Sequence, residues 1–130
     1  MHLTPRKLTT HQKAVLIQVL LTFPDQQVGV RYDPSASDAL SYAEDFLTVF
    51  KVIGWKVTEG APRETSNGQC TGLAFVVCGN EGLPPSAEAL RDALRIYGID
   101  IATICEPKCN MKSYSFVLAV GPETPSVIER

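Results

Sequence analysis

The turn Tyr-Asp-Pro-Ser-Ala-Ser at residues 32–37 holds the residue types best placed to bind a ligand. It leaves a predicted strand and enters a predicted helix, and ligands of open α/β sheets collect at such strand ends. Backbone N–H groups at a helix start attract anions, and the two serine hydroxyls could add donors. The candidate ligand-binding residues are Tyr32, Asp33, Ser35, Ser37, Arg31 and Arg63.

A simpler interpretation of this turn is that Asp33 and the serines only cap the helix that follows. The turn lacks the glycines that let a pyrophosphate approach the backbone, and the Asp33 carboxylate would repel phosphate. The residue types favour this capping interpretation. Ligand binding at the turn is therefore a hypothesis to be tested against the structure.

Four cysteines, at positions 70, 78, 105 and 109, are the other reactive residues. Cys105 and Cys109 could supply one half of a zinc site, but zinc sites usually repeat such a pair and this chain has only one. Cys78 as a nucleophile would need a nearby histidine, and His2 and His11 both lie near the N-terminus. We therefore expect reduced thiols, no catalytic residue and no cofactor.

Length and composition indicate an ordinary globular domain. The chain has 130 residues, 45% hydrophobic residues and a net charge of −2. We predict a single α/β domain over residues 8–122, with flexible ends at 1–7 and 123–130. The net charge leaves no basic surplus for nucleic acid, and the apolar-rich segment 14–23 is about half of what a membrane-spanning helix needs. We expect a cytoplasmic protein that does not itself insert into a membrane.

The first half of the chain predicts helix, strand, helix, strand. Thr9, with Gln12 three residues later, has the pattern of a capping box, and this first helix ends before Pro24. Residues 27–32 alternate as a strand does. Ser35 is the expected cap of the second helix, and Gly54 is placed to end it before a strand at residues 55–57.

The second half predicts a surface loop, then three strands and a helix. Residues 59–69 have turn-forming composition, whereas the unbroken apolar run at 73–78 predicts a strand buried on both faces. Pro84 and Pro85 open a helix that Gly98 ends. We expect the strands at 99–104 and 114–120 to form an antiparallel hairpin, because a short polar connection joins them.

Two architectures fit this order of elements. The favoured one is an α/β three-layer sandwich with a mixed, mainly parallel five-stranded sheet, in which the strands near Val28, Leu73 and Phe116 are central. The alternative is a ferredoxin-like α+β fold, with helices on one face only. The unbroken apolar strands favour the sandwich, because a sheet with one bare face should show alternation.

Core and capping positions carry a resemblance that spans residues 8–122. They are Ala39, Ala43, Phe46, Leu47, Ile53, Gly54, Trp55, Val57, Gly72, Leu73, Pro84, Pro85, Leu90, Ala93, Leu94, Gly98 and Ile99. The pattern resembles the soluble domains of uncharacterised bacterial proteins that carry transmembrane helices ahead of this region. The resemblance implies a domain held at the membrane by a segment absent from this chain. The helix-Gly-Trp-strand passage is also similar, at fold level, to TIR-like and other nucleotide-sensing α/β domains.

Three functional hypotheses follow. The first is a non-enzymatic sensing or interaction domain, which binds a protein partner, itself, or a small ligand at the strand-end turns and the loop 59–69. The second is a domain that binds or hydrolyses a nucleotide-like anion at residues 32–37, with Arg31, Arg63 or Lys108 neutralising its charge. The third is a module stabilised by zinc through Cys105 and Cys109.

Overall fold

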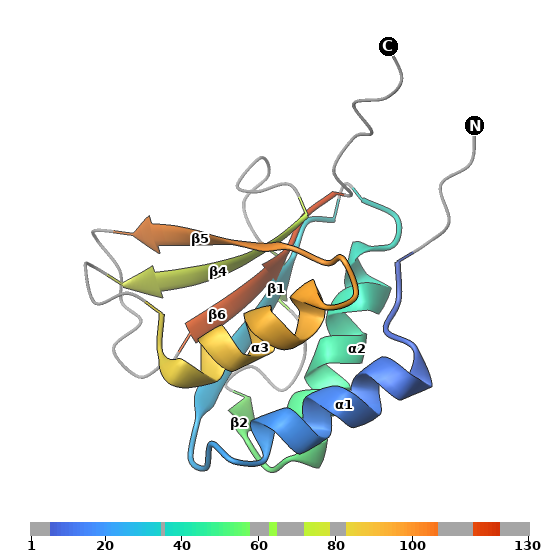
Figure 1. Cartoon of the computed structure of the whole chain (residues 1–130). Coiled ribbons are helices and arrows are strands. Elements are labelled where there is room, and N and C mark those ends of the chain that lie inside the picture. Colours follow the sequence, from blue (N-terminus) through green and yellow to red (C-terminus); the bar gives the residue numbers. More distant parts are fainter. Residues whose placement is uncertain are drawn as a thin grey trace.

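A computed structural model describes residues 6–34, 36–57, 63–64, 72–78, 83–106 and 116–122. Within these residues the chain forms three helices and six strands (Figure 1). The helices are α1 (Thr10–Leu20), α2 (Ala39–Val52) and α3 (Pro85–Arg95). The strands are β1 (Gln27–Tyr32), β2 (Lys56–Val57), β3 (Arg63–Glu64), β4 (Leu73–Cys78), β5 (Ile101–Glu106) and β6 (Phe116–Val120).

The strands join in one mixed sheet with the order β2-β1-β6-β4-β5, and β3 also pairs with β1. Strand β1 runs parallel to β2, β3 and β6, and β4 runs parallel to β5. The pairing of β4 with β6 is antiparallel. The predicted α/β fold with a mixed, mainly parallel sheet is thus confirmed, as is the central place of the strands at Val28, Leu73 and Phe116.

The predicted hairpin of the last two strands is wrong. Strand β6 inserts between β1 and β4, so that Val28 pairs with Phe116 and Phe75 pairs with Leu118. All five residues of β6 are buried, and a strand that is apolar on both faces belongs in the middle of a sheet. Strand β5, which exposes Ala102 and Thr103, lies at the edge instead.

The three described helices lie on one face of the sheet. The units β1-α2-β2 and β4-α3-β5 run in opposite directions and extend toward opposite edges, so right-handed crossovers place both helices on the same side. Helix α1 packs against both α2 and α3 (Figure 1). The described residues therefore do not show the three-layer arrangement. Helices on one face are a feature of the ferredoxin-like alternative, but here the strands of each βαβ unit are direct neighbours.

The core lies between the helices and every second residue of the central strands. Leu73, Phe75 and Val77 of β4 contact it together with alternate residues of β6 and β1. On the opposite face Ala74 and Val76 are fully buried, although no described helix lies over them. The prediction that the apolar strand is buried on both faces is confirmed for Leu73–Val77.

Residues at the starts and ends of the helices cap them largely as the sequence predicts. The Thr9 hydroxyl accepts a hydrogen bond from the Gln12 amide at 3.0 Å, and the Gln12 side chain accepts one from the Thr9 amide at 2.9 Å. Gly54 and Gly98 end α2 and α3 with φ of 85° and 78°, in the left-handed region. Trp55, which follows Gly54, is buried in the core and donates from Nε1 to the Phe23 carbonyl.

The expected start of the second helix at Ser35 is wrong. Helix α2 begins at Ala39, and its N-cap residue is Asp38, which makes no side-chain capping bond. Two successive turns, closed by the amides of Ala36 and Ala39, come first. The Asp38 carboxylate does not cap the helix because Arg6 occupies it. Ser35 itself lies outside the described residues.

Part of the predicted loop 59–69 is a strand. Arg63 and Glu64 form β3, where they pair with Arg31 and Tyr32 of β1. The rest of that segment lies outside the described residues.

Candidate functional site

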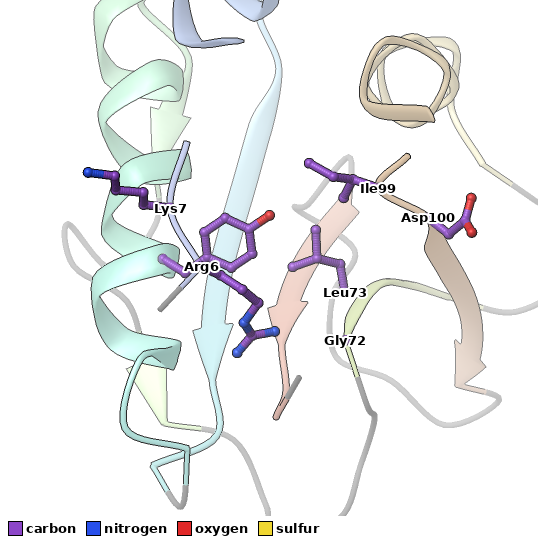
Figure 2. A pocket seen from close by; sticks show the side chains of 7 residues that line it. Arg6, Lys7, Gly72, Leu73, Ile99 and Asp100 are labelled. Atoms are coloured by element: carbon purple, nitrogen blue, oxygen red, sulfur yellow. The ribbon is translucent and has the colours of Figure 1, made fainter. Parts of the chain in front are cut away.

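A pocket opens at one end of the strands, beside the place where neighbouring strands run in opposite directions. Strands β1 and β6 finish at this end, and the antiparallel β4 and β5 begin there. The pocket has a volume of about 340 Å³. Figure 2 shows its lining side chains from close by. Its lining residues come from the N-terminal segment, α2 and the starts of β4 and β5: Arg6, Lys7, Tyr42, Gly72, Leu73, Ile99 and Asp100.

The wall formed by β4 and β5 is mainly apolar. The side chains of Leu73 and Ile99 point toward one another in Figure 2, while Lys7 and Asp100 point away on opposite sides. Leu73 is buried, as is Tyr42 on the α2 side, whereas Ile99 is half-buried. The pocket therefore has an apolar interior with a cationic and an anionic side chain at its margins.

Arg6 forms the opposite wall and is held by hydrogen bonds to Asp38 and Gly121. Its Nε and Nη2 donate to Oδ2 and Oδ1 of Asp38 at 2.9 and 2.8 Å, and its backbone N–H donates to Oδ2 at 2.9 Å. Nη2 also donates to the Gly121 carbonyl at 2.7 Å, and the guanidinium carbon lies 5.2 Å from the centre of the Tyr42 ring. Bidentate geometry and a cation–π contact make this a well-defined wall.

The residues after Arg6 extend this attachment to the middle of α2. The Leu8 amide donates to Asp45 Oδ2 at 2.9 Å, and the Leu8 side chain is buried in the core. The Lys13 ammonium lies 3.6 Å from Asp45 Oδ1. The segment at residues 6–8 is thus fixed along α2 at two carboxylates.

Backbone contacts with the end of β6 hold Gly72, which lines the pocket. The Gly72 amide donates to the Pro122 carbonyl at 2.6 Å, and the Gly121 amide donates to the Gly72 carbonyl at 2.7 Å. Gly72 has a φ of 73°, which L side chains rarely adopt. Together with the bond from Arg6 to Gly121, these contacts join three segments that are distant in sequence.

The pKa of the Asp38 carboxyl is lowered from its usual value. The main cause is the hydrogen bonding from the Arg6 side chain, and the Arg6 backbone N–H and positive charge act in the same direction. Partial burial opposes this effect by raising the pKa. The carboxylate of Asp38 and the guanidinium of Arg6 are therefore a charged pair at neutral pH.

The described candidate residues lie at the same end of the strands, and none of them is among the lining residues of the pocket. Arg31 and Tyr32 end β1, and Arg63 is the register partner of Arg31 on β3. Asp33 is buried, and its amide extends the sheet by donating to the Val120 carbonyl at 2.9 Å. Ser37 is exposed in the turn before α2. The remaining candidate, Ser35, lies outside the described residues.

The zinc prediction falls largely outside the described residues. Cys105 belongs to β5, where its backbone pairs with Val77, and Cys109 is not described. Within the described part of the chain, no three His, Cys, Asp or Glu side chains form a group that could hold a metal ion.

Sequence reasoning missed the pocket because its parts carry no local motif. Arg6 was assigned to a flexible end, and its partner Asp38 is 32 residues away. Ile99 and Asp100 were assigned to a strand. Among the lining residues, Gly72, just before the apolar run, is the one with a positive φ.

The fold and the pocket define an α/β protein with a mixed sheet, described helices on one face and a pocket where the strand direction reverses. Comparisons with protein-family models, with curated proteins and with solved structures found no match. Of the helices formed by the described residues, none combines the length and the apolar character that a membrane crossing requires.

Proposed function

We propose that this chain is a non-enzymatic sensing domain that binds a small amphipathic molecule in the pocket between Arg6 and Leu73. The observation that carries the proposal is the pocket itself, which lies at a reversal of strand direction and has a volume of about 340 Å³. Such volumes and mainly apolar linings are typical of small-molecule sites, and such sites are common where strand order or direction changes.

The lining residues support an amphipathic ligand with an anionic group. Tyr42, Leu73 and Ile99 offer apolar surface to the body of the ligand. Lys7 is exposed at the margin opposite Asp100, and its long side chain would have to turn toward the pocket to reach a carboxylate at the mouth. Arg6 contributes a positive wall, but its charge is balanced by Asp38.

The lining side chains support ligand binding and not catalysis. They include no thiol, imidazole or aliphatic hydroxyl that could act as a nucleophile, and Arg6 is held by Asp38. A pocket whose cation is already paired can recognise a ligand without needing to reorganise. The resemblance to bacterial membrane-anchored proteins supports placing this sensing domain next to a membrane.

Nucleotide-like anions remain the alternative, at residues 32–37. The buried Asp33 beside that turn counts against it, because a phosphate there would face a carboxyl group. No observation in the described residues favours this site over the pocket, and the experiment below includes it as a separate arm.

The test is a thermal-shift screen followed by calorimetry. The probes are hexanoate, benzoate and indole-3-acetate for the pocket, and ADP and inorganic phosphate for the turn. A molecule that binds only the folded protein raises its melting temperature. We expect the carboxylates with apolar bodies to raise it, and ADP and phosphate to leave it unchanged.

Two variants locate the binding site. Ile99→Trp should fill the pocket and abolish the shift, and Lys7→Ala should weaken carboxylate binding. Lys56→Ala is the matched control, because this exposed lysine pairs with Gln27 at the opposite end of the strands, away from the pocket. A carboxylate shift that survives in Ile99→Trp would rule out the pocket, and a flat screen would instead favour a protein partner.

A further inference from the structure

The two edges of the sheet differ in length. On the β1 side, the sheet is completed by β2 and β3, which have two residues each. On the other side lies β5, which has six residues, all in register with β4 from Leu73↔Ile101 to Cys78↔Glu106. Short edge strands are a common means of preventing edge-to-edge pairing. Among the residues that the structure describes, the β2/β3 edge has this protection and the β5 edge lacks it.

Apart from its last residue, Glu106, β5 carries no charged residue, proline or bulge of the kind that protects an edge. Its sequence, Ile-Ala-Thr-Ile-Cys-Glu, contains no lysine, proline or glycine, and its pairing with β4 shows no bulge. Ala102 and Thr103 are both exposed, although consecutive residues of a strand point to opposite faces. The middle of β5 is therefore accessible from both faces of the sheet, and it is uncharged.

We propose that β5 pairs in antiparallel orientation with β5 of a second copy of this chain, which joins the two sheets into one. The two copies of β5 have the same length. A twofold axis through the middle of β5 brings the uncharged middle of one copy beside that of the other. This contact is isologous and closes at the dimer. The short β2 and β3 strands at the far edge prevent the dimer from growing into a longer assembly.

The most compatible register places the twofold axis at Thr103. Thr103 then lies opposite its own copy, which is a favourable cross-strand pair. The small Ala102 comes opposite the larger Ile104 of the partner subunit, so the two fit on the same face. At the ends of the pairing, Asp100 comes opposite position 106 of the second copy.

The dimer is expected to be weak. Pairing of six residues per strand buries less than the roughly 1,600 Å² of a standard stable interface. Association should therefore depend on protein concentration.

The test is sedimentation velocity over about a hundredfold range of concentration, in the presence of a reducing agent. We expect the average mass of the unmodified protein to rise from the monomer toward the dimer. Thr103→Lys, which adds the charge that protected edges carry, should remain monomeric with an unchanged melting temperature. Ala14→Lys, at an exposed position on α1, adds the same charge away from the edge and should dimerise as the unmodified protein does.

A second measurement identifies the contact. In a mixture of isotope-labelled and unlabelled protein, nuclear Overhauser contacts between copies should come from residues 101–105. A protein that stays monomeric at the highest concentration would overturn the proposal. Equal association of Thr103→Lys and the unmodified chain would also overturn it, because the dimer would then use another surface.

Discussion

Arg6 and Asp38, 32 residues apart in sequence, form a bidentate ion pair in which Nε and Nη2 of the arginine donate at 2.9 and 2.8 Å. Their side chains are only 14% and 15% exposed. The pair ties the start of the chain to the N-terminus of α2, and the bond from Arg6 to Gly121 adds the end of β6. The wall of the pocket is thus built from three distant segments.

Asp38→Asn should destabilise the protein by about 2 kcal/mol, because it leaves a mostly buried guanidinium without its counter-ion and weakens three charge-assisted hydrogen bonds. Urea titration measures the free energy of unfolding. Asp92→Asn is the matched control, since Asp92 is 62% exposed and lies 3.3 Å from the Arg91 side chain. It should change stability by less than about 0.5 kcal/mol. Equal losses in both variants would contradict this account of Arg6.

The contribution of this ion pair should disappear in acid. The pKa of Asp38 is lower in the folded protein than in the unfolded chain, so its contribution is fully present above the unfolded value of about 3.9. It is lost as the pH falls through the folded value. The stability difference between the unmodified protein and Asp38→Asn should therefore shrink below about pH 4. A difference that stays constant from neutral pH to pH 2 would show that the carboxylate charge is not its cause.

Gly54→Ala should cost about 1 kcal/mol through backbone conformation alone. Gly54 has a φ of 85°, and a Cβ built on it meets nothing within 4 Å, so no steric clash contributes. The left-handed region costs an L residue about 1–2 kcal/mol. Gly54→Asn should cost less than Gly54→Ala, since asparagine tolerates this region better. Thermal unfolding compares the two, and equal costs would argue against a conformational cause.

Thr9→Ala should destabilise α1 by about 1 kcal/mol, because it removes the hydroxyl that accepts from the Gln12 amide. Thr9→Ser keeps the hydroxyl and is the control. Hydrogen exchange at the first turn of α1 should accelerate in the alanine variant and stay near the original rate in the serine variant. Unchanged exchange in Thr9→Ala would mean that the packing of Leu8, and not the capping box, holds this helix end.

Local patterns in the sequence predicted several elements and their ends correctly. The capping box at Thr9 and the glycines at 54 and 98 act through hydrogen bonds and backbone angles within a few residues, so they can be recognised without the fold. The burial of β4 on both faces was predictable because its residues are apolar without alternation. The expected helix start at Ser35 is wrong because two turns, closed by the amides of Ala36 and Ala39, precede α2.

The sequence by itself thus determined the class of the fold, the apolar strands and most helix ends, since these depend on local interactions. Only the tertiary structure decided that β6 lies between β1 and β4, that the described helices share one face and that Arg6 reaches Asp38. Strand order and ion pairs between distant segments depend on which long-range contacts repay the entropy of closing a loop. A short sequence motif does not show which of these long-range contacts form. The pocket is built from long-range contacts, so the sequence did not predict it.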